Sequence, residues 1–530
     1  MSKSKGWLVL RGAGKSSLAL CMVLCATAAV AKETESPHAA VDRAFDQAFQ
    51  RYQLPGLAVG VIEDGKIVHI RTAGELRAGQ GEPVNADTLF KIASTTKAMT
   101  TAVLARLVDQ GKLSWDDPVI KHLPDFRMQD PWVTQNMQVR DLLIHNSGLR
   151  PFAGDLMLWP EPNHFGRDDI IAGLAHLKPA QSFRANYAYD NLLYVVAGKV
   201  AEQAGGKPYA ELVREHLFVP LGMDRCQVGS WSRDAVGNIA QPHIRQGKAN
   251  VVVREDGEQI PDTPLMAAGG VRCSVKDMLT WMQAWLVPES YPGWLSEKQR
   301  REVWTLQVPM PMSARMHEWD NSHFSGYGYG WRVSDVDGQW KVAHTGTLMG
   351  MYTSLVLLPD QRNGFIILTN GEAEDARTTL TQALVKHYTA PGQGLDVDHY
   401  AKLMEQASMP ASSTTAKQAQ VAGRAAKPAE LKQWQGVYQD PWFGKVRLCP
   451  SEGKVVFASA MSPKMTGTVM RMQDGWRVDW HAIDVGPAPW LEFTAGPADS
   501  VNLQLSYTDD AGKSGSDYAD LALTRVATCD

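Results

Sequence analysis

The sequence predicts an α+β fold, in which an antiparallel sheet is flanked by terminal helices and carries an inserted, mainly helical lobe. A small all-β domain is expected at the carboxyl end. Three observations favour this architecture: strand-like runs lie at both ends of a large unit, helical periodicity dominates between them, and short alternating runs follow a polar segment. The 530 residues, of which 44% are hydrophobic, suffice for more than one globular domain.

The amino-terminal 31 residues have the pattern of a signal peptide. Residues 1–17 carry four basic and no acidic side chains, and an apolar run of 14 residues then ends in Ala29-Val30-Ala31. A membrane-spanning helix needs about 20 apolar residues. We therefore expect cleavage after Ala31 and a periplasmic or secreted chain with no stable membrane span. An uncleaved amino-terminal anchor is the alternative.

The large unit, residues 32–408, is predicted to open with a helix over 39–51. The apolar run 57–62, an Asp64-Gly65 turn and the run 66–70 then make a hairpin signature. The clearest helix of the inserted lobe, expected at about 95–320, runs from Ser94 to Gln110. Apolar residues recur along it at 3.6-residue spacing, at Met99, Val103, Leu104, Leu107 and Val108.

The large unit closes with strand-like runs at 341–344, 353–358 and 365–369. A turn is predicted at Asn363-Gly364 and a helix over 372–387. The run 409–428 is small and polar and reads as a linker. Residues 429–530 then predict the small β-barrel-like domain, whose many tryptophans either fill its core or form a sugar-stacking face. This domain could also cover the mouth of a site in the large unit.

Four cysteines remain after signal cleavage, and export would permit disulfides. Cys449 and Cys529 share the small domain and are the favoured pair. A Cys226–Cys273 bond is the second expectation, and free buried thiols are the alternative for both. We expect neither a metal nor another cofactor, because no Cys or His spacing resembles a zinc site. With 53 basic and 57 acidic residues, we also expect no nucleic-acid partner.

The sharpest local signal is Ser94-Thr95-Thr96-Lys97. A serine and a lysine three residues apart at a helix start share one face, so the amine can assist deprotonation of the hydroxyl. The same Ser-x-x-Lys spacing occurs at Ser2 and at Ser451, but only Ser94 opens a long apolar-striped helix. The structural alternative for Ser94 is an ordinary helix N-cap.

Two later segments add to this signal. Tyr189-Asp190-Asn191 precedes an apolar helix, and His344-Thr345-Gly346 lies at the end of a predicted central strand. In this order, the three motifs resemble those of the penicillin-recognising serine hydrolases, which include class C β-lactamases, D-Ala-D-Ala carboxypeptidases and β-lactamase-like esterases. Sequence segments that flank the motifs support the resemblance over roughly 40–390, among them Leu142–Leu149 and Tyr327–Trp331.

The resemblance implies a role for each motif residue. Ser94 is the nucleophile, and Lys97 and Tyr189 share the general-base work. Asn191, His344, Thr345 and Gly346 bind substrate. The backbone N–H groups of Ser94 and Thr347 form the oxyanion hole, a site where one lost donor costs about 10²–10³ in rate. A lysine against a tyrosine can also favour ammonium and phenolate together, so that the two titrate as a unit.

His344 departs from the lysine usual in β-lactamases and carboxypeptidases. An unperturbed histidine is mostly neutral at pH 7 and holds a substrate carboxylate less well than a lysine does. The alternative to substrate binding is that His344 is only a residue of the pocket wall. His145 is expected to pack and hydrogen-bond a turn rather than act as a base. We therefore predict an exported hydrolase that forms an acyl-enzyme with D-residue peptides, small esters or β-lactams, some of them derived from the cell wall. A slowly deacylating penicillin-binding or sensor protein is the alternative.

Overall fold

The computed structural model describes residues 38–408, 423–496, 500–507, 518 and 520–529. The predicted signal peptide and most of the predicted linker lie outside these residues. The described part of the large unit contains an eight-stranded antiparallel sheet in the order β2-β1-β14-β13-β12-β11-β10-β9. Its strands are β1 (Gly56–Glu63), β2 (Lys66–Gly74), β9 (Val308–Pro309), β10 (Ser325–Tyr327), β11 (Arg332–Val336), β12 (Gln339–Leu348), β13 (Met351–Leu358) and β14 (Asn363–Thr369).

The two ends of the large unit meet inside this sheet. β1 pairs with β14 in antiparallel register, with Leu57 opposite Thr369 and Val61 opposite Phe365. This confirms the expectation that the predicted strands at both ends form one sheet. β1 and β14 read as continuous apolar runs because both of their faces are covered, so successive side chains enter different cores.

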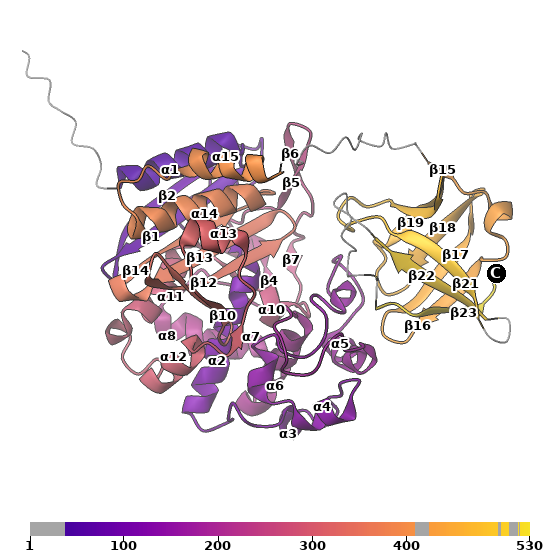
Figure 1. Ribbon diagram of the computed structural model, residues 1–530, viewed down its shortest axis with the longest axis horizontal. Coiled ribbons are helices and arrows are strands. Elements are labelled where there is room, and N and C mark those ends of the chain that lie inside the picture. Colours follow the sequence, from indigo (N-terminus) through magenta and orange to yellow (C-terminus); the bar gives the residue numbers. More distant parts are fainter. Residues whose placement is uncertain (1–37, 409–422, 497–499, 508–517, 519, 530) are drawn as a thin grey trace, which may run out of the picture. The chain divides into compact units, whose positions relative to one another are not determined.

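Helices from the two ends of the large unit cover one face of the sheet (Figure 1). Side chains of α1 (Ala39–Arg51) and α14 (Glu374–Thr389) share one core with every second residue of β1 and β14. On the opposite face, α11 (Val275–Leu286) packs against β1 and β14. Gly60 lies beneath α11, where an added Cβ would come within 2.7 Å of a Leu279 methyl group. A strand residue without a side chain therefore lets this helix approach.

The lobe between β2 and β9 is mainly helical, as predicted, and it carries the first two motifs. Its central pair is α2 (Thr96–Asp109) and α6 (Leu192–Gly205), which pack against each other and against α10 (Met266–Gly269). Of the stripe predicted for α2, Met99, Val103, Leu104 and Leu107 are buried and Val108 is half-buried. Shorter helices surround this pair, namely α3 (Val119–His122), α4 (Pro131–Asn136), α5 (Arg167–Gly173), α7 (Tyr209–Val213) and α12 (Glu297–Trp304).

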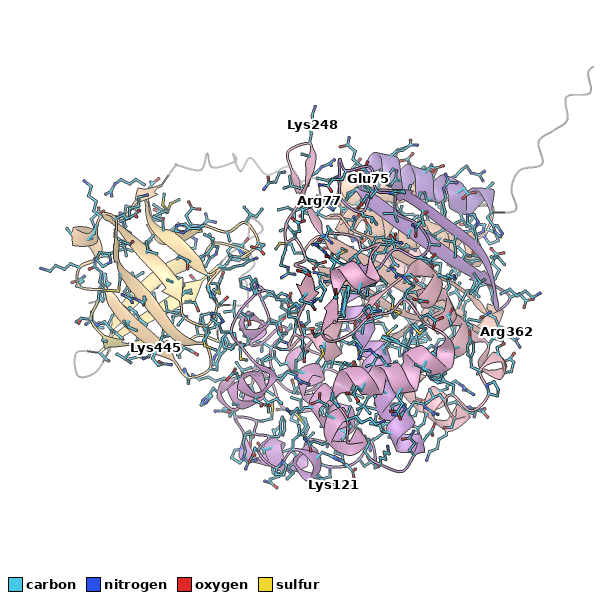
Figure 2. The ribbon with its side chains drawn as sticks, turned by 180° about the vertical axis from the view of Figure 1, so that it is seen from behind. Glu75, Arg77, Lys121, Lys248, Arg362 and Lys445 are labelled. Carbon is cyan, nitrogen blue, oxygen red and sulfur yellow. A yellow bond between two sulfur atoms is a disulfide. The ribbon has the colours of Figure 1, made fainter. Side chains whose placement is uncertain are left out.

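One predicted turn is displaced. Asn363 begins β14 instead of forming a turn, and the chain reverses earlier, through a 3₁₀ turn at Pro359–Gln361 and Arg362 at φ +53°. Arg362 is labelled in Figure 2. The same figure labels Lys248, which lies in the turn between β5 (His243–Gln246) and β6 (Ala249–Val252). The Asn363 side chain instead accepts a hydrogen bond of 3.0 Å from the Asp64 N–H, which ties this turn to the β1–β2 hairpin.

The described carboxyl-terminal residues form a nine-stranded antiparallel sheet, in which eight strands close into a barrel by pairing of β19 (Thr466–Met472) with β20 (Gly475–Trp480). Its first strand, β15 (Arg424–Ala425), lies within the segment 409–428 predicted to be a linker. The end of that segment therefore belongs to this sheet. The other strands are β16 (Gly436–Asp440), β17 (Gly444–Ser451), β18 (Lys454–Ser459), β21 (Trp490–Ala495), β22 (Val501–Ser506) and β23 (Leu523–Ala527).

Both expected disulfides are present, Cys226–Cys273 and Cys449–Cys529, so the free-thiol alternative is wrong. They close segments with sequence separations of 47 and 80 residues. Loop-closure entropy assigns each bond a stabilisation of about 4 kcal/mol relative to the reduced chain. None of the described helices combines the length and the apolar character needed to cross a membrane.

Candidate active site

Ser94 lies at a strained connection between β3 (Phe90–Lys91) and α2. It belongs to a single 3₁₀ turn, Ala93–Thr95, and α2 itself begins two residues later than predicted. Ala93 has φ +49°, a left-handed conformation that costs a non-glycine residue about 1–2 kcal/mol. The N-cap residue of α2 is Thr95 rather than Ser94. The N-cap alternative for Ser94 is therefore wrong, and its hydroxyl faces the cavity instead.

Lys97 contacts Ser94 from the first turn of α2. The fully buried Lys97 ammonium donates to Ser94 Oγ at 3.2 Å, to Asn191 Oδ1 at 2.8 Å and to the Ala268 carbonyl at 2.8 Å. The last two partners can only accept. In a neutral amine they would take both N–H groups, which leaves the nitrogen lone pair directed at the Ser94 hydroxyl.

Burial also favours the neutral amine. Desolvation lowers the pKa of Lys97 to about 7, although the carboxylates of Asp155 and Asp190 oppose this shift. A cation without water around it loses much of its hydration energy, and this loss exceeds the attraction of the nearby acids. The lysine is therefore close to half deprotonated at neutral pH.

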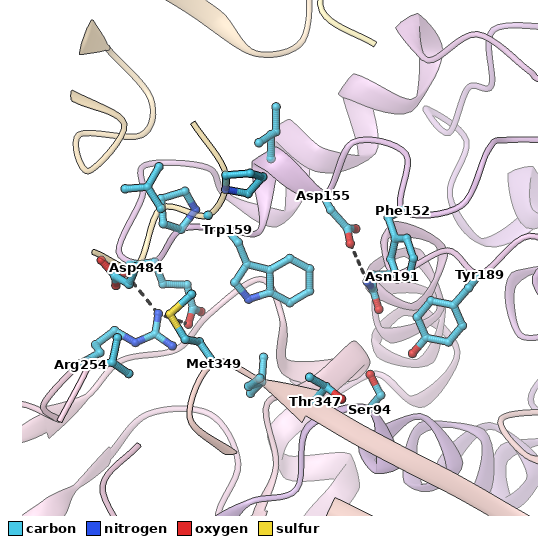
Figure 3. Close-up of a pocket in the computed structure, with 18 of the residues that line it drawn as sticks. Ser94, Phe152, Asp155, Trp159, Tyr189, Asn191, Arg254, Thr347, Met349 and Asp484 are labelled. Carbon is cyan, nitrogen blue, oxygen red and sulfur yellow. Dashed lines mark hydrogen bonds and ion pairs between the residues drawn. The ribbon is translucent and has the colours of Figure 1, made fainter. Parts of the chain in front are cut away.

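Asn191 is held in one orientation by a residue that the sequence analysis did not identify. Its Nδ2 donates to Asp155 Oδ2 at 2.8 Å (Figure 3). This bond leaves its carbonyl oxygen turned toward Lys97. A carboxylate cannot donate in return, so the amide cannot flip without losing both bonds. Asn191 occupies the N-cap position of α6, but its side chain makes no capping bond, and the Asp190 side chain accepts from the Leu192 N–H at 2.9 Å instead.

Tyr189 completes the group around the nucleophile. Its hydroxyl points toward Ser94 (Figure 3), and its ring centroid lies 4.9 Å from Lys97 Nζ. Burial raises the pKa of Tyr189 to about 12. The lowered pKa of Lys97 and the raised pKa of Tyr189 both disfavour an ammonium–phenolate pair, since desolvation favours the neutral form of each group.

His145 fixes the turn that carries Tyr189. Its Nδ1 accepts from the Asp190 N–H at 3.0 Å, and its ring centroid lies 4.3 Å from that of Tyr189. Burial holds the pKa of His145 well below its usual range. A neutral ring fastened in this way supports the structural role predicted for His145.

The opposite side of the site is formed by the sheet. Thr345 and Thr347 of β12 line the cavity, whereas His344 is 1% exposed and lies behind it. His344 Nε2 hydrogen-bonds the Tyr327 hydroxyl at 2.8 Å, and its Nδ1 lies 2.7 Å from the Thr345 carbonyl. Burial, with the positive charge of Arg332 next, holds the pKa of His344 well below its usual range. Both ring nitrogens are engaged, so the structure favours the alternative of a wall residue over substrate binding.

Gly346 brings the two sides together. An added Cβ would overlap the Ile92 carbonyl oxygen and lie 3.0 Å from the Ala93 Cβ. β12 therefore packs directly against the segment that holds Ser94. The glycine serves close approach of two backbones rather than contact with substrate.

Arg332 is the second residue that the sequence analysis missed. It begins β11, lines the cavity, and donates to Thr345 Oγ1 at 2.9 Å. It also lies close to the Tyr187 hydroxyl. Neither partner neutralises the guanidinium charge. The sequence contained a signal for Arg332, because this residue directly follows the Tyr327–Trp331 segment that supports the family resemblance.

A cavity of about 620 Å³ is lined by Ser94, Asp155, Tyr189, Asn191, Arg332, Thr345 and Thr347. We call Ser94, Lys97, Tyr189 and Asn191 the helical wall, and Arg332, Thr345 and Thr347 the sheet wall. The lining also includes aromatic and charged residues farther from Ser94 and several residues of the barrel, among them Phe152, Trp159, Glu161, Arg254, Met349, Asp484 and Tyr518. Within the described residues, no three His, Cys, Asp or Glu side chains gather where they could hold a metal ion.

An antiparallel sheet with a helical lobe, and a serine and lysine at their junction, define a class of acyl-transferring proteins. The profile of the Beta-lactamase family matches residues 41–388, so the chain belongs to this family. Over 374 residues, covering 67% of this chain and 91% of the relative, it is 27% identical to D-alanyl-D-alanine-carboxypeptidase/endopeptidase AmpH of Escherichia coli K12.

Two further relatives extend the comparison. Over 354 residues, covering 64% of this chain, it is 28% identical to unguisins hydrolase ungD' of Aspergillus campestris, and the match spans 62% of that hydrolase's length. The octameric penicillin-binding protein homologue from Pyrococcus abyssi superposes with a TM-score of 0.57 at 19% identity. That superposition covers 92% of this chain and 100% of the other, and it indicates a shared fold.

Proposed function

We propose that this protein is a serine hydrolase that forms an acyl-enzyme on Ser94 and cleaves amide or ester bonds. One observation carries the proposal: the Lys97 amine contacts the Ser94 hydroxyl, while two obligate acceptors occupy its other hydrogen-bond directions. The names of the relatives, a carboxypeptidase/endopeptidase and a hydrolase, support the same reaction class.

In the first step, neutral Lys97 takes the Ser94 proton as Ser94 Oγ attacks the substrate carbonyl. The tetrahedral oxyanion is then held by the backbone N–H groups of Ser94 and Thr347, which line the same cavity. Tyr189 stays protonated at neutral pH and lies against both Ser94 and Lys97. It passes a proton to the leaving group and regains one from Lys97. Water attacks the acyl-enzyme in the second half-reaction and releases the acid.

We further propose that the substrates carry a carboxylate close to the scissile bond. The Arg332 guanidinium, which forms no ion pair within the described residues, and the Thr345 hydroxyl lie side by side on the sheet wall. This arrangement supplies the fixed positive charge that a neutral His344 does not. Peptides that end in a free carboxylate and β-lactams meet this requirement, and simple esters do not.

The test compares Ser94→Ala with the unchanged protein. We expect a fluorophosphonate and a fluorescent penicillin to label the unchanged protein and not the variant, which loses all turnover. Nitrocefin, p-nitrophenyl esters and D-amino-acid peptides then rank the substrates, and intact mass follows the adduct. A Ser94→Ala protein that keeps full activity would refute the proposal. An adduct that persists for hours would instead favour the slowly deacylating sensor.

We also propose that the chain is exported after cleavage behind Ala31. The two disulfides support this, because such bonds form and persist in oxidising compartments. Amino-terminal sequencing of the protein from a periplasmic extract should begin with Lys32-Glu33-Thr34. A mature protein that still begins at Met1 contradicts the proposal.

A further inference from the structure

A buried arginine outside the predicted motifs contacts the peptide unit that carries one of the oxyanion donors. Arg377 lies in the first turn of α14, the helix that covers the sheet next to β13 and β14 (Figure 1). Its Nη1 donates to the Gly346 carbonyl at 2.9 Å and to Thr347 Oγ1 at 2.6 Å. The Gly346 carbonyl and the Thr347 N–H belong to the same peptide bond.

The geometry of that bond separates the arginine from the reaction. The cis peptides in the described part of the chain precede Pro160 and Pro162, so the Gly346–Thr347 bond is trans. A trans peptide directs its C=O and its N–H to opposite sides. Arg377 therefore binds the rear of the peptide unit whose N–H serves the oxyanion.

The surroundings of Arg377 keep its charge effective. The residue is 8% exposed, and its guanidinium lies 5.2 Å from the centroid of the Tyr352 ring. Its acidic neighbour, Glu374, is 3.5 Å away but mostly solvent-exposed, so water screens that pair. A hydrogen bond to a cation draws electron density from the carbonyl and strengthens the N–H as a donor, since bonds in series polarise one another.

We propose that Arg377 is a positioning residue of the oxyanion hole: it orients and polarises the Gly346–Thr347 peptide so that the Thr347 N–H binds developing negative charge. The inference rests on the proposed function. It assigns to Arg377 no contact with substrate. Because the oxyanion forms only in the transition state, loss of Arg377 lowers kcat and kcat/KM together and leaves KM nearly unchanged.

The test is a graded series, Arg377→Lys, Arg377→Gln and Arg377→Met. Lysine keeps the charge, glutamine keeps one donor, and methionine keeps neither. We expect kcat/KM to fall in that order, by about 10- to 100-fold for methionine, a part of the 10²–10³ that a lost oxyanion donor costs. The inhibition constant of a boronic acid, which forms a tetrahedral adduct on the serine, should rise by the same factors.

Lys386→Met is the matched control. Lys386 is also a buried cation on α14, and it pairs with Asp337 at 2.5 Å away from the site. This variant should lose stability and keep its kcat and its boronic-acid affinity.

If Arg377→Met or, should that variant not fold, Arg377→Gln keeps kcat/KM and boronic-acid affinity within twofold of the unchanged protein, the inference is wrong. If the unchanged protein is neither labelled by fluorophosphonate nor active, the proposed function itself fails. These two results are distinguishable because labelling of the unchanged protein does not depend on the variants.

Discussion

The two walls of the cavity hold their cations in different ways. On the helical wall, Lys97 is buried among a hydroxyl, an amide and a carbonyl, and its pKa is lowered to about 7. On the sheet wall, Arg332 reaches the cavity, and a guanidinium keeps its proton throughout the accessible pH range. Ser94 faces both. The comparison indicates that the helical wall moves protons while the sheet wall supplies fixed charge and fixed donors.

The difference follows from the chemistry of the two side chains. An amine has a single nitrogen whose proton is released when water is excluded, so burial turns lysine into a base. A guanidinium spreads its charge over a planar fork of five N–H donors, which matches the geometry of a carboxylate. Exchanging the two residue types would therefore remove both functions.

The largest effect is expected at Lys97. Lys97→Met and Lys97→Arg should each lower kcat/KM by at least about 10³, because neither side chain can accept the Ser94 proton. In the unchanged protein, kcat/KM should rise with pH through about 7, since the neutral amine is the active form. Stopped-flow acylation with a p-nitrophenyl ester measures the loss in the variants and the pH profile of the unchanged protein. Thermal unfolding confirms that the variants fold. An active Lys97→Arg protein would contradict the assignment.

The next largest effect is expected where the walls join. Gly346→Ala places a Cβ against the Ile92 carbonyl oxygen and should move Thr347 away from Ser94. Loss of one oxyanion donor predicts a decrease of about 10²–10³ in kcat. Gly257→Ala is the control, because its nearest neighbour would be 3.7 Å away. Steady-state kinetics of both variants test this prediction. Equal kcat values for Gly346→Ala and Gly257→Ala would show that the close approach of the two backbones is not required.

A smaller and selective effect is expected at Arg332. A hydrogen bond to a charged group contributes about 1.5–3 kcal/mol. Arg332→Met should therefore raise KM by about 10- to 100-fold for a peptide with a free terminal carboxylate. For the same peptide as a methyl ester, KM should stay within about twofold. Equal losses on both substrates would assign Arg332 to packing rather than to recognition.

The smallest effect is a shift in pH dependence at Asp155. Its carboxylate raises the pKa of Lys97 against the effect of burial. Asp155→Asn removes that charge and still offers an acceptor to Asn191, so the pKa of Lys97 should fall. The midpoint of the kcat/KM profile should then move below about 7, with only a small loss at its plateau. A midpoint that moves upward or stays in place contradicts this electrostatic role.

Much of the fold could be predicted because the local pattern and the tertiary structure agree. The helix over 39–51 has the predicted bounds, and β1 and β14 lie where continuous apolar runs indicate them. The turn at Asn363 was misplaced because several residues there can reverse a chain, and a side-chain bond to Asp64 decides between them. Short pairings such as β15 with β19 were missed because two residues carry no periodicity.

The candidate site could be predicted only in part. Ser94, Lys97, Tyr189 and Asn191 belong to motifs with fixed spacing, and the structure brings them together in one place. Arg332, Asp155 and Arg377 stand alone in the sequence, and each acts on a residue from a different element. The motif predicts that His344 binds substrate, but in the structure its side chain is buried and does not line the cavity.

The amino-acid sequence by itself determined which reactive groups are available and which helices and strands carry them, because spacing and hydrophobic pattern are local properties. Only the tertiary structure decided what those groups can do. A pKa near neutrality for a lysine, a fixed amide orientation and a polarised peptide bond all arise from desolvation and from contacts between distant segments. Such effects depend on distances and on exclusion of water, and neither is written in the order of residues along one segment.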